Sequence, residues 1–261
     1  MSNLMKGSGR KRILCYPHYP SRGATIYRIA KELGIELSNK PTGKFDLVIY
    51  WEYATERKEW DLLEGFTTLQ VINLQSRNIG KDYLDHQMRK AFGYSTQVDP
   101  QNYDGKVVKK SIQNAVHDGM FVEAPFEKEV GFIYQRLVDS SVSESEVMDM
   151  RIPVMNKFIP HLYRAYRSSN ERFVNVPPRV ELETNVDAMI SPEEKNNLFK
   201  LCDSMGLDYV EFDVLRDCID DRIYVVDANN TPQGPPKNLS DAEKRQSIES
   251  YARCFKQQFL S

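Results

Sequence analysis

The first part of the chain alternates short apolar runs with one amphipathic segment, a pattern typical of a small α/β unit. The runs at Arg12–Tyr16, Phe45–Tyr50 and Thr68–Asn73 predict three strands, and Gly23–Leu33 predicts a helix between the first two. A shorter helix is expected at Glu56–Leu63. Because strands that alternate with helices pair in parallel, we expect a parallel sheet in this unit.

The pattern changes near residue 80, where one clear helix is followed by strand-like runs. Lys81–Phe92 carries an apolar stripe at four-residue intervals and is followed by a glycine, which predicts a helix that ends there. The strand-like runs that follow are Val107–Lys110, Gly131–Val138, Met148–Val154 and Leu162–Tyr166. These runs predict antiparallel pairing. The expected fold class is therefore α+β, with an α/β N-terminal unit followed by antiparallel sheets with packed helices.

Two later helices have strong start signals. Ser191 is followed three residues later by Glu194, and Ser240 by Glu243, and both pairs are capping boxes. We accordingly divide the chain into a disordered basic arm at residues 1–10, a small α/β domain at 11–78 and a larger domain at 79–261.

The segment Asp208–Pro232 carries the strongest chemical signal, because it is typical of a β-hairpin with acidic residues on one face. If the turn centres on Asp220, one pair of opposed residues is Asp213 with Asp227, and another is Glu211 with Asn229. All four side chains would then project to the same side. Opposed carboxylates destabilise a sheet, and oxygen ligands without histidine or thiol suit Mg²⁺. The alternative is an ordinary solvated face of a hairpin.

Composition limits the classes of function. The 261 residues include 35 basic and 37 acidic side chains, and a net charge of -2 gives no global attraction to nucleic acid or a membrane surface. The basic cluster Lys6–Arg12 favours a solvated tail over a nucleic-acid contact. Without an apolar run of bilayer length or a signal peptide, we expect a cytoplasmic protein. The four cysteines and four histidines show no metal-binding spacing.

Several cationic and apolar segments could serve a nucleotide. The strand bearing Lys109 and Lys110 points one lysine toward each face, so that one of them could neutralise phosphates; a strand end in solvent is the alternative. The apolar strand that ends at Gln135–Val138 could border an adenine ring or simply belong to the core. Arg151, with Asp149 on the same face, suits either a phosphate clamp or a structural ion pair.

One strand has an unusual residue near its end. Met148–Val154 alternates cleanly, but Pro153 cannot donate a hydrogen bond to a ladder. We therefore expect this strand at an edge of the sheet, or a bulge near its end. The loop Pro17–Arg22 follows the first strand, where open α/β sheets tend to bind ligands, so His18 and Arg22 could contact a substrate; a surface loop is the alternative.

Taken in order, these pieces resemble the ATP-grasp superfamily of ATP-dependent ligases, most closely the branch of glutathione synthetases and ribosomal-protein glutamate ligases. The resemblance covers about Lys81 to Pro236 and implies a role for each matched residue. The phosphate-binding lysine is Lys110, with Lys109 as the alternative, and the adenine-binding segment includes Gln135, Arg136 and Leu137. Asp149 belongs to the nucleotide site. Arg151 and Arg164 would be catalytic, Asn175 would lie near the site, and the metal ligands would be Asp213, Asp227 and Asn229.

The resemblance implies a Mg²⁺-dependent reaction in which ATP activates a substrate carboxylate as an acyl-phosphate, which an amine then attacks. ATP and Mg²⁺ are the expected cofactors. A small molecule or peptide carboxylate is the expected partner, with no nucleic acid or membrane, and a homodimer stays open. A phosphotransferase acting on a small molecule and a non-catalytic ATP-binding module are the alternatives. Asp227 departs from the family's commoner glutamate, and the expected phosphate loop has few glycines.

Overall fold

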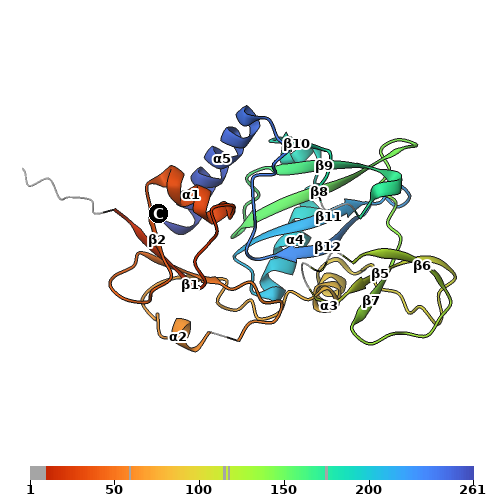
Figure 1. Ribbon diagram of the computed structural model, residues 1–261, viewed down its shortest axis with the longest axis horizontal. Helices are drawn as coiled ribbons and strands as arrows, with labels where there is room; N and C mark the ends of the chain where they lie inside the picture. The colour runs from red at the N-terminus through yellow and green to blue at the C-terminus, as the bar shows by residue number, and fades with distance from the viewer. Residues whose placement is uncertain (1–9, 59, 114–115, 117, 174–175) are drawn as a thin grey trace, which may run out of the picture.

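The computed structural model describes residues 10–58, 60–113, 116, 118–173 and 176–261. Its strands form a four-stranded, a three-stranded and a five-stranded sheet (Figure 1). The fold is α+β with both parallel and antiparallel pairing, which confirms the predicted class. Within these described residues, none of the helices has the length and hydropathy needed to cross a lipid bilayer. The predicted arm at 1–10 lies outside the described residues except for Arg10.

The four-stranded sheet is parallel, as expected, with strand order β2-β1-β3-β4. Its elements are β1 (Arg12–Pro17), α1 (Thr25–Leu33), β2 (Glu36–Ser38), β3 (Leu47–Trp51), α2 (Asp61–Glu64) and β4 (Val71–Ile72). The predicted helix at Glu56–Leu63 shortens to one turn and the predicted strand at Thr68–Asn73 to two residues. The short strand β2 was not expected, because three residues carry too little periodicity to be recognised.

The three-stranded sheet is antiparallel, with β5 (Gly105–Ser111) between β6 (Met120–Ala124) and β7 (Phe132–Arg136). Helix α3 (Lys81–Phe92) precedes it and has the predicted bounds. Gly93 ends α3 in a left-handed conformation with φ of 81°, which glycine adopts without strain.

The five-stranded sheet has the order β10-β9-β8-β11-β12 and is antiparallel throughout. The strands are β8 (Glu146–Met155), β9 (Leu162–Ser168), β10 (Arg179–Glu183), β11 (Tyr209–Arg216) and β12 (Ile223–Asn229), and the helices are α4 (Pro192–Met205) and α5 (Asp241–Phe259). Single 3₁₀ turns stand at Ser169–Glu171 and Val186–Ala188. Both predicted capping boxes are present at the starts of α4 and α5.

Strand β8 lies at the centre of this sheet, so the prediction that Pro153 marks an edge strand was wrong. The pairing explains why the proline is accepted. The pairing of β8 with β9 runs from Glu146 to Arg151 and stops before Pro153, while β11 continues alongside it. The missing N–H therefore falls near the end of β8, where only β11 flanks it.

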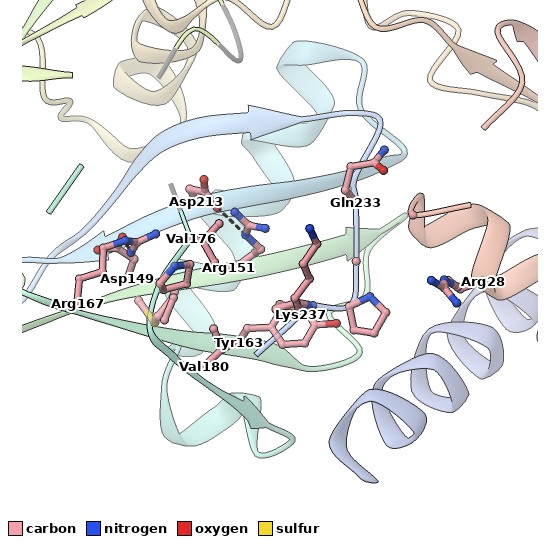
Figure 2. A pocket seen from close by; sticks show the side chains of 17 residues that line it. Arg28, Asp149, Arg151, Tyr163, Arg167, Val176, Val180, Asp213, Gln233 and Lys237 are labelled. Carbon is pink, nitrogen blue, oxygen red and sulfur yellow. Dashed lines mark hydrogen bonds and ion pairs between the residues drawn. The ribbon is translucent and has the colours of Figure 1, made fainter. Parts of the chain in front are cut away.

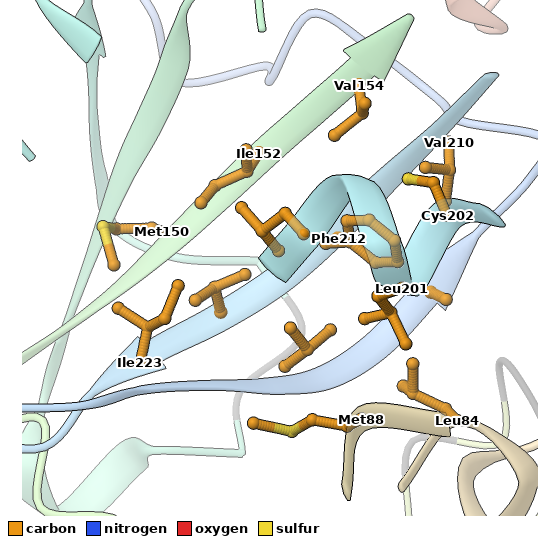
Figure 3. Close-up of a cluster of buried hydrophobic side chains, with 14 of the residues drawn as sticks. Leu84, Met88, Met150, Ile152, Val154, Leu201, Cys202, Val210, Phe212 and Ile223 are labelled. Atoms are coloured by element: carbon orange, nitrogen blue, oxygen red, sulfur yellow. The ribbon is translucent and has the colours of Figure 1, made fainter. Parts of the chain in front are cut away.

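One face of the five-stranded sheet is buried against helices α3 and α4 (Figure 3). Met150, Ile152 and Val154 of β8 and Val210 and Phe212 of β11 all point into this core. Because side chains alternate along a strand, the intervening residues must face the opposite side of the sheet. Burial of one face thus fixes which polar residues share the other.

A second core joins the beginning and end of the chain. Helix α5 lies beside α1 (Figure 1), and its buried Tyr251, Phe255 and Phe259 pack in one cluster with residues of β1, β3 and α1. Tyr163 and Tyr209 of the five-stranded sheet belong to the same cluster. The expected domains at 11–78 and 79–261 therefore share a hydrophobic core, and their division stays a prediction.

Asn73 connects the two units by hydrogen bonds at the end of β4. Its side chain is fully buried; Nδ2 donates to the carbonyl of Tyr209 at 2.7 Å, and Oδ1 accepts from the N–H groups of Asp208 and Tyr209 at 2.8 and 2.9 Å. Its own N–H donates to the Asp208 carboxylate. Asn73 has φ of 61°, in the left-handed region that asparagine enters more readily than most residues.

We expect Asn73→Ala to lower the free energy of unfolding by about 3 kcal/mol, because it leaves three backbone groups of Asp208 and Tyr209, where β11 begins, without their partners. Chemical denaturation monitored by fluorescence measures the change. The matched control is Asn196→Ala on the exposed face of α4, which should change stability by no more than about 0.5 kcal/mol. Equal losses in the two variants would contradict this structural role.

His161 is a second buried polar residue with consequences for stability. It is completely buried, with Nε2 at 3.1 Å from the Tyr163 hydroxyl and 3.3 Å from the Ser247 hydroxyl, and its ring lies 4.4 Å from that of Tyr251. Burial lowers the pKa of His161 to about 3. Because the unfolded chain binds this proton near pH 6.5, acid stabilises the unfolded state and weakens the fold as pH falls through 6.5.

We expect His161→Phe to reduce the loss of stability between pH 7 and pH 5 by about 2 kcal/mol, which is the protonation term for a pKa of about 6.5 in the unfolded chain. Denaturation at both pH values in wild type and variant isolates this group from the buried carboxyls, which shift stability in the other direction. Parallel pH profiles for the two proteins would show that His161 is protonated in the folded state.

Candidate active site

The hairpin has the predicted register. In the pairing of β11 with β12, Asp213 lies opposite Asp227 and Glu211 opposite Asn229. The register shifts by one residue directly after Asp213, so the predicted match does not continue toward the turn. The apolar partners on the other face, including Phe212 and Ala228, are buried in the core and explain why this register forms.

Protein cations neutralise part of this acidic face. The Arg151 Nε donates to Asp213 Oδ1 at 3.0 Å and lies 3.5 Å from Glu211 Oε1. Glu211 is buried and accepts a hydrogen bond from the Tyr251 hydroxyl of α5 at 3.1 Å. The sequence argument assigned the compensation of three carboxylates to a metal alone, whereas Arg151 supplies one positive charge for two of them.

The burial of these groups changes their acidity. Desolvation raises the pKa of Glu211 to about 7 and that of Asp227 to about 6. The Asp213 carboxylate beside Arg151 raises the pKa of this guanidinium, which stays charged. Ionisation of either carboxyl is therefore unfavourable unless a nearby cation compensates the negative charge.

Asp227 has a carboxylate oxygen that is available to bind a cation. Its Oδ1 is buried and accepts no hydrogen bond from the described residues, and Lys81 Nζ lies 3.9 Å away. Asn229 Oδ1 accepts from the Thr231 N–H at 3.0 Å and hydroxyl at 3.3 Å. Among the residues that the structure describes, no group of three His, Cys, Asp or Glu side chains could hold a metal ion. The predicted ligand set contains two aspartates and an amide.

A cationic cavity of about 180 Å³ adjoins this acidic pair. It is lined by charged residues from several elements: Lys81, Lys110, Asp118, Asp149, Arg151, Arg167, Arg172, Asp213 and Asp227. Desolvation lowers the pKa of Lys110, while the carboxylates of Asp227, Asp149 and Asp213 oppose that change. Five cations against four acids at one cavity favour an anionic ligand.

The two candidate lysines of β5 point in different directions. Lys110 lines the cavity, as the resemblance implies. Lys109 binds Glu129 at 2.5 Å and lies 4.2 Å from the centre of the Phe132 ring, on the other face of the strand. The structure therefore brings Lys110, and not its neighbour, to the acidic pair.

A narrower cavity of about 100 Å³ continues from the cationic one, with Lys110, Asp149 and Arg172 lining both. Its apolar lining comes from β5, β6, the residues after β7, and strands β11 and β12: Val108, Phe121, Leu137, Val138, Leu215 and Val226. The Gln135 side chain donates to Thr96 at 2.7 Å and the Arg136 guanidinium binds Asp217 at 2.6 Å, so both are engaged within the protein although their residues line this slot.

Arg164 is not brought to the site. It pairs with Met150 in the β8–β9 ladder and so lies on the core face of the sheet, where it binds Glu181 at 3.0 Å. The expected catalytic position for Arg164 does not agree with this placement. Arg167, three residues later on β9, lies on the cavity face and pairs with Asp149. The predicted Asn175 lies outside the described residues.

Lys81, Arg167 and Arg172 also line the cationic cavity, although they were not predicted as site residues from the sequence. Arg167 lies on the same face of β9 as Tyr163 and Ala165. Once it is known which face of β9 borders the cavity, the alternation of side chains along the strand predicts that Arg167 lies there. Lys81 begins α3 and reaches Asp227 from more than a hundred residues away in the sequence, and no local pattern signals that contact.

A third and larger cavity, of about 350 Å³, adjoins the same residues and opens toward the N-terminal unit (Figure 2). Asp149, Arg151, Arg167 and Asp213 line both it and the cationic cavity. Gly23 and Arg28 of the N-terminal unit line it too, whereas His18 and Arg22 are not among its lining residues. Asp149 lines all three spaces, the apolar slot, the cationic cavity and the larger outer cavity, whereas Arg151 lines only the last two.

No protein-family model and no curated protein matches this chain by sequence. Solved structures do match in fold. The ATP-grasp ligase PsnB, in complex with a phosphomimetic variant of a minimal precursor, Mg and ADP, aligns with a TM-score of 0.57 at 13% identity, over 95% of this chain and 99% of that one.

Two further structures extend this likeness. The RimK domain ATP-grasp protein from Sphaerobacter thermophilus aligns with a TM-score of 0.53 at 12% identity, over 97% of this chain and 100% of that one. D-alanine–D-alanine ligase from Bacillus anthracis, complexed with ATP, gives 0.57 at 10% identity, over 96% of each chain. The fold that the sequence resemblance predicts is therefore confirmed, and this chain has the ATP-grasp fold.

Proposed function

We propose that this protein is an ATP-dependent ligase that activates a substrate carboxylate as an acyl-phosphate and joins it to an amine with the help of Mg²⁺. One observation carries the proposal: an apolar slot, a cationic cavity and an acidic hairpin lie in a continuous row at one sheet face. Their order corresponds to the base, phosphates and metal of a nucleotide. The likeness to ATP-grasp ligases bound to ATP or ADP supports it.

The nucleotide base would occupy the slot between Val108, Leu137 and Leu215, with its phosphates in the adjoining cavity. Lys110, Arg167 and Arg172 line the phosphate end. Charge-assisted hydrogen bonds from such groups are about twice as strong as neutral ones, and the guanidinium groups can bind two oxygens at once. Gln135 and Arg136 would hold the edge of the slot through Thr96 and Asp217 instead of touching the base by their side chains.

Asp213, Asp227 and Asn229 would hold Mg²⁺. The buried Oδ1 of Asp227, which has no hydrogen-bond donor within the described residues, fits this role, as do oxygen-only ligands without sulfur or imidazole. The ion supplies charge neutralisation at the phosphate oxygens when bound.

In the first step, a carboxylate oxygen of the acceptor attacks the γ-phosphorus and ADP leaves. Arg151, held between Asp213 and Glu211, faces both the cationic and the outer cavity and would orient the acceptor carboxylate beside the phosphate. An amine then attacks the acyl carbon, and phosphate leaves. Arg167, on the same face, would stabilise the negative charge that develops on the acyl oxygen.

The acceptor would be a small molecule or a peptide. PsnB was solved in complex with a precursor peptide, and the outer cavity of this chain is open enough to admit a side chain of such a partner. The predicted cytoplasmic location agrees with a supply of ATP and Mg²⁺. A homodimer stays a prediction from the sequence.

The test of the reaction class is chemical trapping. Protein, ATP and Mg²⁺ are incubated with a mixture of carboxylates and with hydroxylamine, which converts an acyl-phosphate to a hydroxamate. A ligase forms ADP, phosphate and hydroxamate in equal amounts. A phosphotransferase forms ADP and a stable phosphorylated product without free phosphate, and a binding module forms none of these; either result would overturn the proposal.

Asp227→Asn should abolish the dependence of ATP binding on Mg²⁺, because it removes the negative charge at the buried carboxylate. Calorimetric titration with Mg²⁺ and with EDTA measures the difference: wild type should bind ATP at least about tenfold more tightly with the ion. The control is Asp104→Asn, an exposed aspartate outside the cavities. A metal dependence like that of wild type would remove Asp227 from the ligand set.

Arg167→Gln and Arg164→Gln form a matched pair on one strand. We expect Arg167→Gln to reduce hydroxamate formation about a hundredfold, because its charge faces the reacting groups. Arg164→Gln should retain wild-type activity, because its side chain binds Glu181 on the opposite face. Thermal unfolding confirms that both variants are folded. The reverse order of activities would restore the role that the sequence predicted for Arg164.

A further inference from the structure

The outer cavity is lined by more cations than acids, and the proposed reaction at Arg151 assigns no role to the excess positive charge. Among its described lining residues, four are cationic, Arg28, Arg151, Arg167 and Lys237, and two are acidic, Asp149 and Asp213. The two acids pair with Arg167 and Arg151. The imbalance therefore rests on Arg28 and Lys237, whose side chains make no hydrogen bond or ion pair with the residues that the structure describes.

These two cations stand away from the nucleotide end. Arg28 projects from α1, and Lys237 from the segment between β12 and α5 (Figure 2). Neither lines the cationic cavity or the apolar slot. In Figure 2, the Lys237 side chain extends toward the labelled Arg151 and Gln233, and Arg28 lies apart from it, beside α1.

The surface between the two charged ends is largely apolar. Ala165 and the ring of Tyr163 come from β9, Val180 from β10, and Pro235 and Pro236 from the segment that bears Lys237. The cavity thus has two cations, Arg151 and Arg167, where it adjoins the cationic cavity, apolar walls, and two further cations, Arg28 and Lys237, that line the outer cavity alone. This pattern is complementary to a molecule with an anionic group at each end and a hydrocarbon section between them.

We propose that the acceptor of this ligase is a carboxylate that carries a second anionic group, which Arg28 and Lys237 bind. The inference rests on the proposed function for the role of the first carboxylate at Arg151. The acceptor is either a free dicarboxylate or an acidic side chain in a peptide with a second acid nearby.

Charge complementarity explains why a second anion is selected over a neutral group. Arg28 and Lys237 are exposed in the absence of a ligand, so they are hydrated there and cost the fold little. A ligand that covers Tyr163 and Val180 would remove water from both cations. A neutral end group would then leave them unpaired, whereas an anionic one would form charge-assisted hydrogen bonds.

The test compares probes that differ by one charge. Succinate, glutarate, adipate and pimelate are each titrated beside the corresponding monoamide by saturation-transfer NMR, with and without Mg²⁺ and ADP. We expect at least one diacid to bind at least about tenfold more tightly than its monoamide, a difference of about 1.4 kcal/mol. A capped peptide with two neighbouring glutamates, beside one with a single glutamate replaced by glutamine, forms the peptide arm.

The double variant Arg28→Gln/Lys237→Gln should lose this preference while its thermal unfolding stays that of wild type. Lys31→Gln/Lys256→Gln is the matched control, since both lysines are exposed on α1 and α5 and line none of the cavities. The control should keep the preference for the diacid.

Three results would overturn the inference: equal binding of diacid and monoamide in both arms, no binding of any probe at millimolar concentration, or a preference that survives in the double variant. Calorimetry of Mg²⁺ and ADP on the same samples reports on the proposed function separately. Failure to bind nucleotide, with the diacid preference intact, would refute ligase activity but leave the anion site in place.

Discussion

Burial of one face of the five-stranded sheet is the constraint on which the rest of the molecule depends. Met150, Ile152 and Phe212 must contact α3 and α4 to leave water, and a shift of one residue in either strand would expose them. The same constraint fixes Arg151 and Asp213 on the opposite face, directly paired across the two strands. The polar face therefore owes its geometry to the apolar side chains packed on the opposite face of the sheet.

The charged groups on the polar face of the sheet are compensated by partners from different elements. Arg151 lies between Asp213 and Glu211. The Tyr251 hydroxyl of α5 donates a hydrogen bond to the other carboxylate oxygen of Glu211, Oε2. A buried ion pair contributes little net stability, but removal of one partner leaves an uncompensated charge, which is costly. The network consequently specifies where Arg151 points more than it strengthens the fold.

Features with strong local signals could be predicted from the sequence. The hairpin register followed from two apolar runs around an Asp-rich turn, and the helix starts from the capping residues Ser191 and Ser240. Strands β2, β6 and β10 were not predicted, because runs of three to five residues carry little periodicity. The face on which Arg164 lies could not be predicted, because β9 carries large side chains on both sides and pairing with β8 is needed to tell the two faces apart. Lys81 and Arg28 reach their cavities through tertiary contacts that leave no mark in the sequence.

The packing of α5 on α1 has a thermodynamic consequence for ligand binding. The helix contributes Tyr251 to the support of Glu211 and, through Phe255 and Phe259, anchors the N-terminal unit that bears Arg28. If α5 detaches locally, both ends of the outer cavity lose their support while the central sheet keeps its core. Docking of α5 and binding in that cavity would therefore be linked equilibria: a ligand that binds more tightly when α5 is docked stabilises the docked helix by the same coupling free energy.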